Sequence, residues 1–245
     1  MRVCGVTDIG CHRKDNQDSY AIRQLNGEAV LLVVCDGMGG AQAGSVASLV
    51  AVEEFTAAVE EQLAQGVPAD PNQREQVLGG ACARANERVF RMSRENPAYE
   101  GMGTTLVAAL VLSGGAYVVN VGDSRGYLLE DGAIRQVTVD HSLVQLLVDR
   151  GEITPDQARI HPQKNLITRA LGVDSRVEYD LRRLSPRPGG RLLLCSDGLS
   201  NLLDDNTLLC LSGQEEDPER FCRALLEQAL ERGAPDNVTV VLAQL

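Results

Sequence analysis

Short apolar segments separated by tight turns dominate the middle of this chain. Only two or three residues separate neighbouring segments at Gly114-Gly115, Gly122-Asp123 and Asp131-Gly132. Connections this short are typical of β-hairpins, because two parallel strands need a crossover of a dozen or more residues. The spacing predicts antiparallel sheet and counts against a doubly wound nucleotide-binding fold. The expected strands are 3–7, 29–35, 104–112, 116–121, 126–129, 134–138, 191–195 and 238–242.

Longer amphipathic segments interrupt these strands. Apolar residues at helical spacing predict helices over about 44–64, 73–94 and 218–232. Asn72 is the expected cap of the second helix, with Glu75 three residues further on. Asp217 is the expected cap of the third, and Gly233 follows its end. Strands interrupted by helix pairs predict a layered α+β domain.

Two capping motifs mark the segment 140–164. Ser142 with Gln145, and Thr154 with Gln157, predict two short helices twelve residues apart. The segment fits either a small helical insertion between strands or an ordinary connector.

The composition restricts the classes of partner. The chain has 245 residues, of which 44% are hydrophobic, and a formal net charge of -11. This length fits one large domain or two small ones. The acidic balance argues against binding nucleic acid or anionic lipid. Aromatic residues make up 3% of the chain, which argues against base-stacking surfaces. No apolar run approaches the roughly 20 residues of a membrane span, and no signal sequence is apparent at the start.

The cysteines indicate a reducing compartment. There are seven, an odd number, and no pair has Cys-x-x-Cys spacing. Cys35, Cys195 and Cys210 lie within apolar runs. We therefore expect reduced cysteines and a cytoplasmic location.

Aspartates recur at the ends of apolar strands. Asp36 and Asp197 each follow such a strand and precede a glycine. Asp123 follows another strand, Asp236 precedes the last one, and Asp18 lies near the start of the chain. A single Asp-Gly pair is ordinary turn sequence. Its repetition after buried strands suggests that several carboxylates meet at one rim of a sheet.

Carboxylates that meet in this way require a cation or a proton. At 4 Å and an effective dielectric of 20, two of them repel by about 4 kcal/mol. Carboxylate oxygens, water and a carbonyl at Gly37 suit Mg²⁺ or Mn²⁺. His12, His141 and His161 do not have zinc-ligand spacing. Two such ions bridged by a carboxylate would activate a water toward a phosphomonoester. Arg13 then either binds the phosphate or is an ordinary solvated arginine.

Eight motifs in one order, spanning almost the whole chain, resemble the metal-dependent Ser/Thr protein phosphatases (the PPM or type 2C family) in their compact bacterial form. They are Asp8-x-Gly10-x-x-Arg13-x-x-Asn16-Gln17-Asp18, Val34-Cys35-Asp36-Gly37-Met38-Gly39-Gly40, Gly103-Thr104-Thr105, Val121-Gly122-Asp123-Ser124-Arg125, Asp140-His141-Ser142, His161-Pro162-x-Lys164-Asn165-Leu166-Ile167-Thr168-Arg169-Ala170-Leu171-Gly172, Ser196-Asp197-Gly198-Leu199 and Asp236-Asn237-Val238-Thr239.

The resemblance implies a fold and a role for each site residue. The fold is a four-layer αββα sandwich of two antiparallel sheets flanked by helix pairs. It forms one catalytic domain over 1–245, with a mobile flap inserted at about 143–165. By this resemblance, Asp36 would bridge two metal ions, the Gly37 carbonyl would bind the first, and Asp197 and Asp236 would bind the second. Asp123 and Asp197 would hold a weaker third ion. Asp18 would bind metal through water, and Arg13 would bind the substrate phosphate.

The resemblance also implies the activity. The expected enzyme is a Mn²⁺- or Mg²⁺-dependent, monomeric protein-serine/threonine phosphatase. A metal-bound hydroxide would attack phosphorus directly and reverse the action of a Hanks-type kinase in bacterial signalling. Gln17 and Met38 depart from relatives that carry Glu and His at these positions. The general acid is therefore open between a metal-bound water, His141 and His12.

Three other interpretations of the sequence are weaker. The segment 122–126 matches the Gly-x-Ser-x-Gly elbow of serine hydrolases, with Ser124 as nucleophile, although a hairpin signal rather than a helix follows it. The segment 37–40 resembles a dinucleotide-binding loop that lacks its third glycine. A relative without catalytic activity, which only binds a partner, is the third alternative, although all the expected ligands are present.

Overall fold

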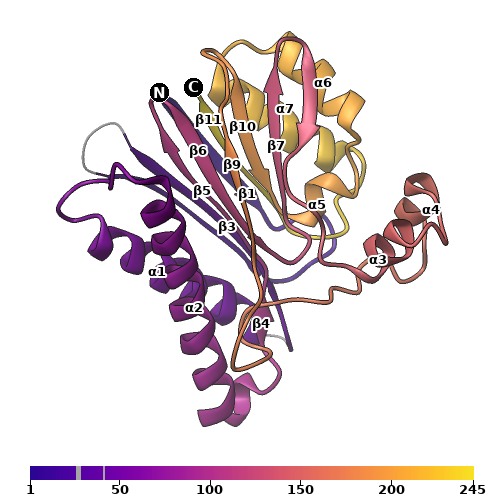
Figure 1. The fold of residues 1–245 in the computed structure, drawn as a ribbon. Helices are drawn as coiled ribbons and strands as arrows, with labels where there is room; N and C mark the ends of the chain where they lie inside the picture. The colour runs from indigo at the N-terminus through magenta and orange to yellow at the C-terminus, as the bar shows by residue number, and fades with distance from the viewer. Residues whose placement is uncertain (26–28, 41) are drawn as a thin grey trace.

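Two antiparallel sheets lie face to face at the centre of the computed structural model, which describes residues 1–25, 29–40 and 42–245 (Figure 1). We call them the β1 sheet and the β3 sheet. The β1 sheet has the order β1 (Arg2–Asp8), β11 (Val238–Gln244), β10 (Arg191–Cys195), β7 (Arg125–Glu130) and β8 (Ala133–Gln136). The β3 sheet has the order β2 (Asp18–Gln24), β3 (Val30–Met38), β5 (Leu106–Leu112), β6 (Gly115–Val121) and β9 (Asp180–Leu184), and the short β4 (Gly103–Thr104) pairs with the end of β3.

Helices cover the outer face of each sheet. Figure 1 shows α1 (Ala43–Gln62) and α2 (Pro71–Glu95) on one side, with the short helix η1 (Pro97–Tyr99) following α2. On the other side lie α5 (Asp197–Ser200), α6 (Asp205–Gln214) and α7 (Pro218–Glu231). This arrangement confirms the predicted αββα sandwich.

The alternation of side chains along the strands explains the layers. In β3, Leu31 and Val33 face α1 and α2, whereas Leu32 and Val34 face the β1 sheet. Both faces of the strand are therefore buried, which is why it is an unbroken apolar run. A third apolar cluster packs α6 and α7 against the outer face of the β1 sheet, with Phe221 fully buried in it.

One predicted hairpin is wrong. Gly122-Asp123 does not join neighbouring strands, because β6 belongs to the β3 sheet and β7 to the β1 sheet. The chain passes between sheets here with Gly122 at φ +102°, a conformation that favours glycine. A short glycine turn looks the same in sequence whether the next strand joins the same sheet or the facing one. The crossover leaves Asp123 at the rim between the two sheets.

Several element boundaries differ from the prediction. The cap of α2 is Asp70 rather than Asn72, because Pro71 occupies the first helical position and the Asp70 side chain accepts a hydrogen bond from the backbone N–H of Asn72. The expected strand 104–112 is divided into β4 and β5. The strands β2 and β9 and the helix α6 were not predicted, since their sequences are polar on the exposed side and give weak periodicity.

The segment between β8 and β9 projects from the sandwich (Figure 1). It contains the two predicted short helices, α3 (Leu143–Asp149) and α4 (Pro155–Arg159). Thr154 forms a complete capping box at α4, whereas Ser142 caps α3 without a reciprocal contact. The two ends of this projecting segment are joined by a hydrogen bond, in which the backbone N–H of Leu143 donates to the carbonyl of Leu166 at 2.8 Å. We call residues 143–166 the flap.

Candidate metal centre and active site

Five aspartates meet at the rim of the sandwich where β3 ends. Asp18 and Asp36 are direct partners across the β2–β3 ladder. Asp197 begins α5 immediately beyond β10, and Asp236 lies two residues before β11. Asp123 lies in the crossover between β6 and β7. The structure thus brings together every aspartate that the sequence singled out.

Burial and mutual repulsion disfavour the charged forms of four of these aspartates, Asp18, Asp36, Asp123 and Asp197. Burial raises the pKa of Asp36 well above its usual value, and the Asp18 and Asp197 carboxylates add to the effect. Burial raises the pKa of Asp18 to about 7. Burial, followed by the Asp197 charge, raises the pKa of Asp123 to about 8. The pKa of Asp197 is also raised, by burial and by Asp236. The rim therefore favours the binding of cations.

The donor set fits a hard divalent ion. Oδ1 of Asp18 and Oδ1 of Asp197 are buried and have no hydrogen-bond partner among the described residues. A buried carboxylate oxygen without a partner is costly, and a cation would satisfy it. Across residues 1–25, 29–40 and 42–245, no three His, Cys, Asp or Glu side chains are close enough to enclose an ion by themselves. A bound ion would therefore take further oxygens from the backbone, water or phosphate.

The backbone at Gly37 is packed too closely for a side chain. A Cβ atom there would overlap the carbonyl oxygen of Gly44 and lie 2.8 Å from that of Gln17. The Gly37 N–H also donates to the Gln17 carbonyl at 3.0 Å. These contacts fix the peptide next to Asp36, which carries the carbonyl predicted to bind metal.

Hydroxyl and amide groups hold the aspartates in place. The Asp36 N–H donates to Oγ1 of Thr105 at 2.9 Å, and the same hydroxyl lies 2.7 Å from Oγ of Ser124, beside Asp123. Oγ of Ser196 donates to Oδ2 of Asp18 at 2.7 Å. No sequence signal indicates that Thr105, Ser124 and Ser196 support the aspartates, although each belongs to one of the eight motifs.

Asn237 ties the two ends of the chain together at the rim. Its Oδ1 accepts from the backbone N–H of Gln17 at 2.8 Å, and its Nδ2 donates to the carbonyls of Ile9 and Asp15. The loop that carries Arg13 is thereby held beside Asp236.

Arg13 and Lys164 bring positive charge to the rim, in addition to Arg125, whose charge lowers the pKa of Asp123 against the larger effect of burial. Nη2 of Arg13 is 2.6 Å from Oδ2 of Asp236, so the arginine predicted to bind phosphate is at the site and paired with a predicted metal ligand. Lys164 lies at the end of the flap, and its charge lowers the pKa of Asp197 against the larger effect of burial. Lys164 belongs to one of the eight motifs, but no sequence signal marked it as a site residue.

The histidines differ in their surroundings. Nδ1 of His141 accepts from the backbone N–H of Gly122 at 3.1 Å, and the ring is buried. Burial lowers the pKa of His141, and the Arg169 guanidinium lowers it further. His141 therefore holds the turn that precedes Asp123. His12 is exposed in the loop before Arg13.

The arrangement around Ser124 excludes the serine-hydrolase alternative. Ser124 is fully buried and its hydroxyl is engaged by Thr105. The strand β7 begins at the next residue, whereas a nucleophile elbow requires a helix there.

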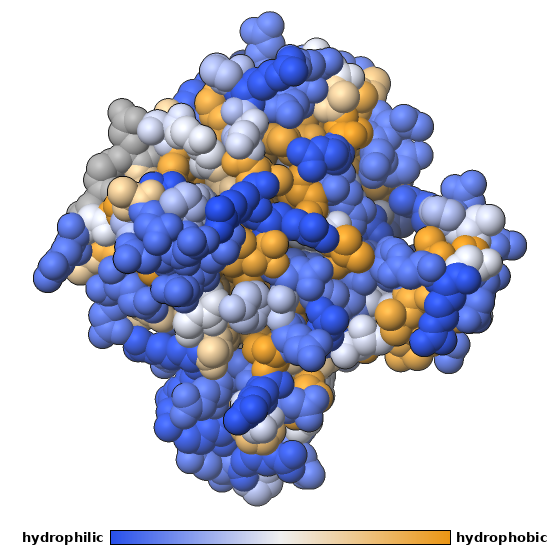
Figure 2. All heavy atoms as spheres, in the orientation of Figure 1, coloured by the Kyte–Doolittle hydropathy of each residue, from blue (hydrophilic) through white to orange (hydrophobic). Residues whose placement is uncertain are grey.

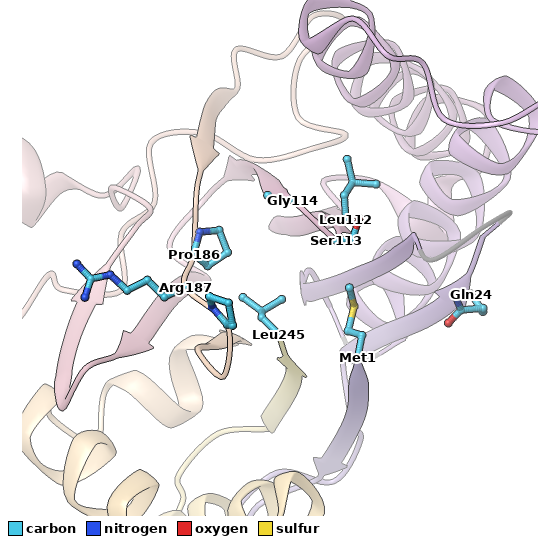
Figure 3. A pocket seen from close by; sticks show the side chains of 10 residues that line it. Met1, Gln24, Leu112, Ser113, Gly114, Pro186, Arg187 and Leu245 are labelled. Carbon is cyan, nitrogen blue, oxygen red and sulfur yellow. The ribbon is translucent and has the colours of Figure 1, made fainter.

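A large cavity lies at the opposite end of the sandwich, near the start of β1 and the end of β11 (Figure 3). Its volume is about 450 Å³, and Leu112, Pro186 and Leu245 contribute to its lining. Arg187 at its edge is paired with Asp131. This lining offers no group of carboxylates, so the rim at Asp36 remains the candidate centre.

An αββα sandwich with carboxylates at one rim has the architecture of the metal-dependent phosphatases. A family model for protein phosphatase 2C matches residues 12–243. The chain therefore belongs to the protein phosphatase 2C family.

Named relatives agree with this assignment. The serine/threonine protein phosphatase PstP of Mycobacterium tuberculosis is 41% identical over 246 residues, which cover 100% of this chain and 45% of PstP. The chain thus spans less than half the length of that relative. The serine/threonine phosphatase stp of Listeria monocytogenes is 36% identical, with 97% of this chain and 93% of stp covered.

Solved structures show the same fold. Stp1 from Staphylococcus aureus has a TM-score of 0.92 and 38% identity, covering 99% of this chain and 94% of that one. The catalytic domain of PstP in complex with two manganese ions has a TM-score of 0.83 and 38% identity, covering 99% and 97%. Within the described part of this chain, no helix is both long and apolar enough to cross a membrane.

Proposed function

We propose that this chain is a protein-serine/threonine phosphatase that depends on Mn²⁺ or Mg²⁺. The observation that carries the proposal is the meeting of five aspartates at one rim, where buried oxygens of Asp18 and Asp197 have no hydrogen-bond partner within the described part of the chain. Asp36 would bridge two ions, with the Gly37 carbonyl on the first and Asp197 and Asp236 on the second. Asp123 with Asp197 would hold a weaker third ion, and Asp18 would act through water.

The bound ions would supply Lewis acidity that makes a water nucleophilic and neutralises phosphate charge. The protein's own part is positioning. Arg13 and Lys164 lie where they can bind phosphate oxygens. Direct transfer to water, without a phosphoenzyme, is favoured because the nearby hydroxyls of Ser124 and Ser196 are buried and hydrogen-bonded. Of the candidate proton donors to the leaving group, we prefer a water bound at the rim over His141, whose ring is buried.

The flap is the proposed contact with the protein substrate. Leu146, Ile160 and Leu166 are exposed on it, and Figure 2 shows apolar surface over the flap among polar groups. We place this flap, residues 143–166, within one catalytic domain, 1–245. Phosphorylated Ser/Thr proteins, a Hanks-type kinase among them, are the proposed partners of a monomeric enzyme. The seven free cysteines favour the cytoplasm.

The test is hydrolysis of a chromogenic phosphomonoester and of a phosphoserine peptide. Activity is expected with Mn²⁺, and it should be lost with chelator and in Asp36→Ala. Asp205→Ala is the matched control, since Asp205 is exposed on α6, which covers the opposite sheet from β3. Activity that survives both chelation and Asp36→Ala would overturn the proposal, as would equal losses in the two variants.

A further inference from the structure

Two cysteines from opposite ends of the chain meet at the outer edge of the β1 sheet. Cys4 lies on the edge strand β1, and Cys222 lies in α7, which packs against that strand. Their Sγ atoms are 2.9 Å apart. A disulfide bond is about 2.05 Å long, so a movement of about 0.9 Å would bring the sulfurs to bonding distance.

Neighbouring contacts hold the two sulfurs against each other. Arg2 lies on the same face of β1 as Cys4 and forms an ion pair with Asp217, the cap of α7. Sγ of Cys4 donates to the carbonyl of Pro218 at 3.2 Å, and Pro218 is one helical turn before Cys222. The meeting of the sulfurs therefore follows from the docking of α7 on β1 rather than from one side-chain rotation.

The two thiols differ in access and acidity. Cys4 is partly exposed, whereas Cys222 is fully buried. The hydrogen bond from Cys222 lowers the pKa of Cys4. A thiol that is both accessible and easily ionised is the one that reacts with an oxidant. Cys222 is then placed to resolve the oxidised product.

We propose that Cys4 and Cys222 form a redox-responsive pair that hydrogen peroxide converts to a disulfide. In the first step the Cys4 thiolate attacks one peroxide oxygen. An S–O bond forms, the O–O bond breaks, and the released hydroxide takes up a proton to become water. In the second step the Cys222 sulfur attacks the Cys4 sulfenic acid. The S–S bond forms, the S–O bond breaks, and the hydroxide leaves as water with the Cys222 proton. The sulfurs lose two electrons in total, and peroxide gains them.

The bridge would fasten the edge strand to its covering helix. It would join residues near the two ends of the chain and so restrict the unfolded state strongly. The oxidised protein should unfold about 5–10 °C above the reduced protein. Because β1 leads into the Arg13 loop and α7 into the Asp236 loop, the bridge would fasten both segments that enter the rim.

The test is a thiol count and peptide mapping on the full chain with chelator present. Peroxide should lower the number of free thiols from seven to five. A Cys4–Cys222 linked peptide should appear without reduction, and dithiothreitol should restore seven thiols. Cys222→Ala should leave Cys4 as a sulfenic acid that dimedone labels, and Cys4→Ser should prevent the loss of the buried thiol. Cys210→Ser, which alters an exposed cysteine in α6, should still form the bridge.

Loss of Cys11 or Cys210 before Cys4, or linkage only between molecules, would overturn the proposal. The proposal would also be overturned if all seven thiols remain free in protein whose methionines peroxide has oxidised. If Cys222→Ala does not fold, Cys4→Ser on the partly exposed strand decides the question. A linked peptide without the rise in unfolding temperature would overturn the stabilising consequence.

Discussion

Arg13 and Asp236 form an ion pair at the rim, with Nη2 of the arginine 2.6 Å from Oδ2 of the aspartate. One is the proposed phosphate ligand and the other a proposed metal ligand. A cation bound to Asp236 would weaken its hold on the arginine, and a phosphate would offer Arg13 a new partner. The ion pair therefore keeps the guanidinium and the carboxylate oriented at the site. When metal and phosphate bind together, Asp236 would pair with the metal and Arg13 with the phosphate.

We expect Asp36→Asn to stabilise the chelated protein while removing its response to metal. The substitution deletes the carboxylate at the centre of the repelling group, so the metal-free midpoint should rise by about 2–4 °C. Thermal unfolding with chelator and with Mn²⁺ provides the measurement. The unaltered chain should gain stability from Mn²⁺, and Asp36→Asn should not. A lower midpoint in chelator would show that repulsion at the rim is not significant.

The metal-free protein should become less stable as the pH rises from about 5 to 8. Asp18 has a folded-state pKa of about 7 and Asp123 of about 8, both raised by burial from 3.8. Groups with raised pKa bind protons more tightly in the folded state, so their contribution is complete below the unfolded value and is lost as the pH passes the folded value. Asp204 and Asp217 have lowered pKa values and act in the opposite sense, but only near and below their ordinary pKa. His141, whose pKa burial lowers from 6.5, also acts in the opposite sense near that pH, and the two aspartates with raised pKa values outweigh this single group.

Urea unfolding at intervals across pH 5–8 in chelator measures this slope. Asp18→Asn should flatten part of it, and saturating Mn²⁺ should flatten most of it, because a cation neutralises the repelling charges. A slope that is the same with and without Mn²⁺ would place its origin away from the rim.

The sequence is sufficient to predict those site residues whose position depends on a buried strand. Asp36 and Asp197 were predicted to meet because an apolar strand precedes each, and the structure places both at the rim. The sequence predicts a hairpin at Gly122, whereas the structure has a crossover between the two sheets. Local turn sequence does not specify which sheet receives the next strand. The pairing of Arg13 with Asp236 and the proximity of Lys164 to Asp197 depend on contacts more than thirty residues apart in the sequence. No periodicity indicates contacts of this kind.

Gly37→Ala should cost both stability and activity, whereas Gly40→Ala should cost neither. A Cβ at Gly37 would overlap the Gly44 carbonyl oxygen, and a methyl forced against backbone costs about 1–3 kcal/mol or more. Among the described residues beyond its chain neighbours, no atom lies within 4 Å of a Cβ placed at Gly40, three residues away, so its effect should stay within about 0.5 kcal/mol. Urea unfolding and phosphomonoester hydrolysis measure the two effects. Equal behaviour of the variants would show that close packing at Gly37 is not required.

Arg13→Ala should lower kcat/KM for phosphomonoesters, and Arg23→Ala should leave it unchanged. The two arginines have side chains of equal exposure, 51%, and each is paired with a carboxylate, Asp236 for Arg13 and Glu60 for Arg23. Only Arg13 lies at the rim. Loss of a charged hydrogen bond to phosphate costs about 1.5–3 kcal/mol, or roughly 10- to 100-fold in kcat/KM.

Steady-state kinetics at saturating Mn²⁺ separates phosphate binding from an effect on metal. If Arg13 acts on phosphate, the loss persists at every Mn²⁺ concentration, and Arg13→Lys restores part of it, because lysine keeps the charge without the planar fork. If Arg13 only positions Asp236, excess Mn²⁺ restores the activity of Arg13→Ala. That result would remove Arg13 from the substrate site and leave Lys164 as the phosphate-binding cation.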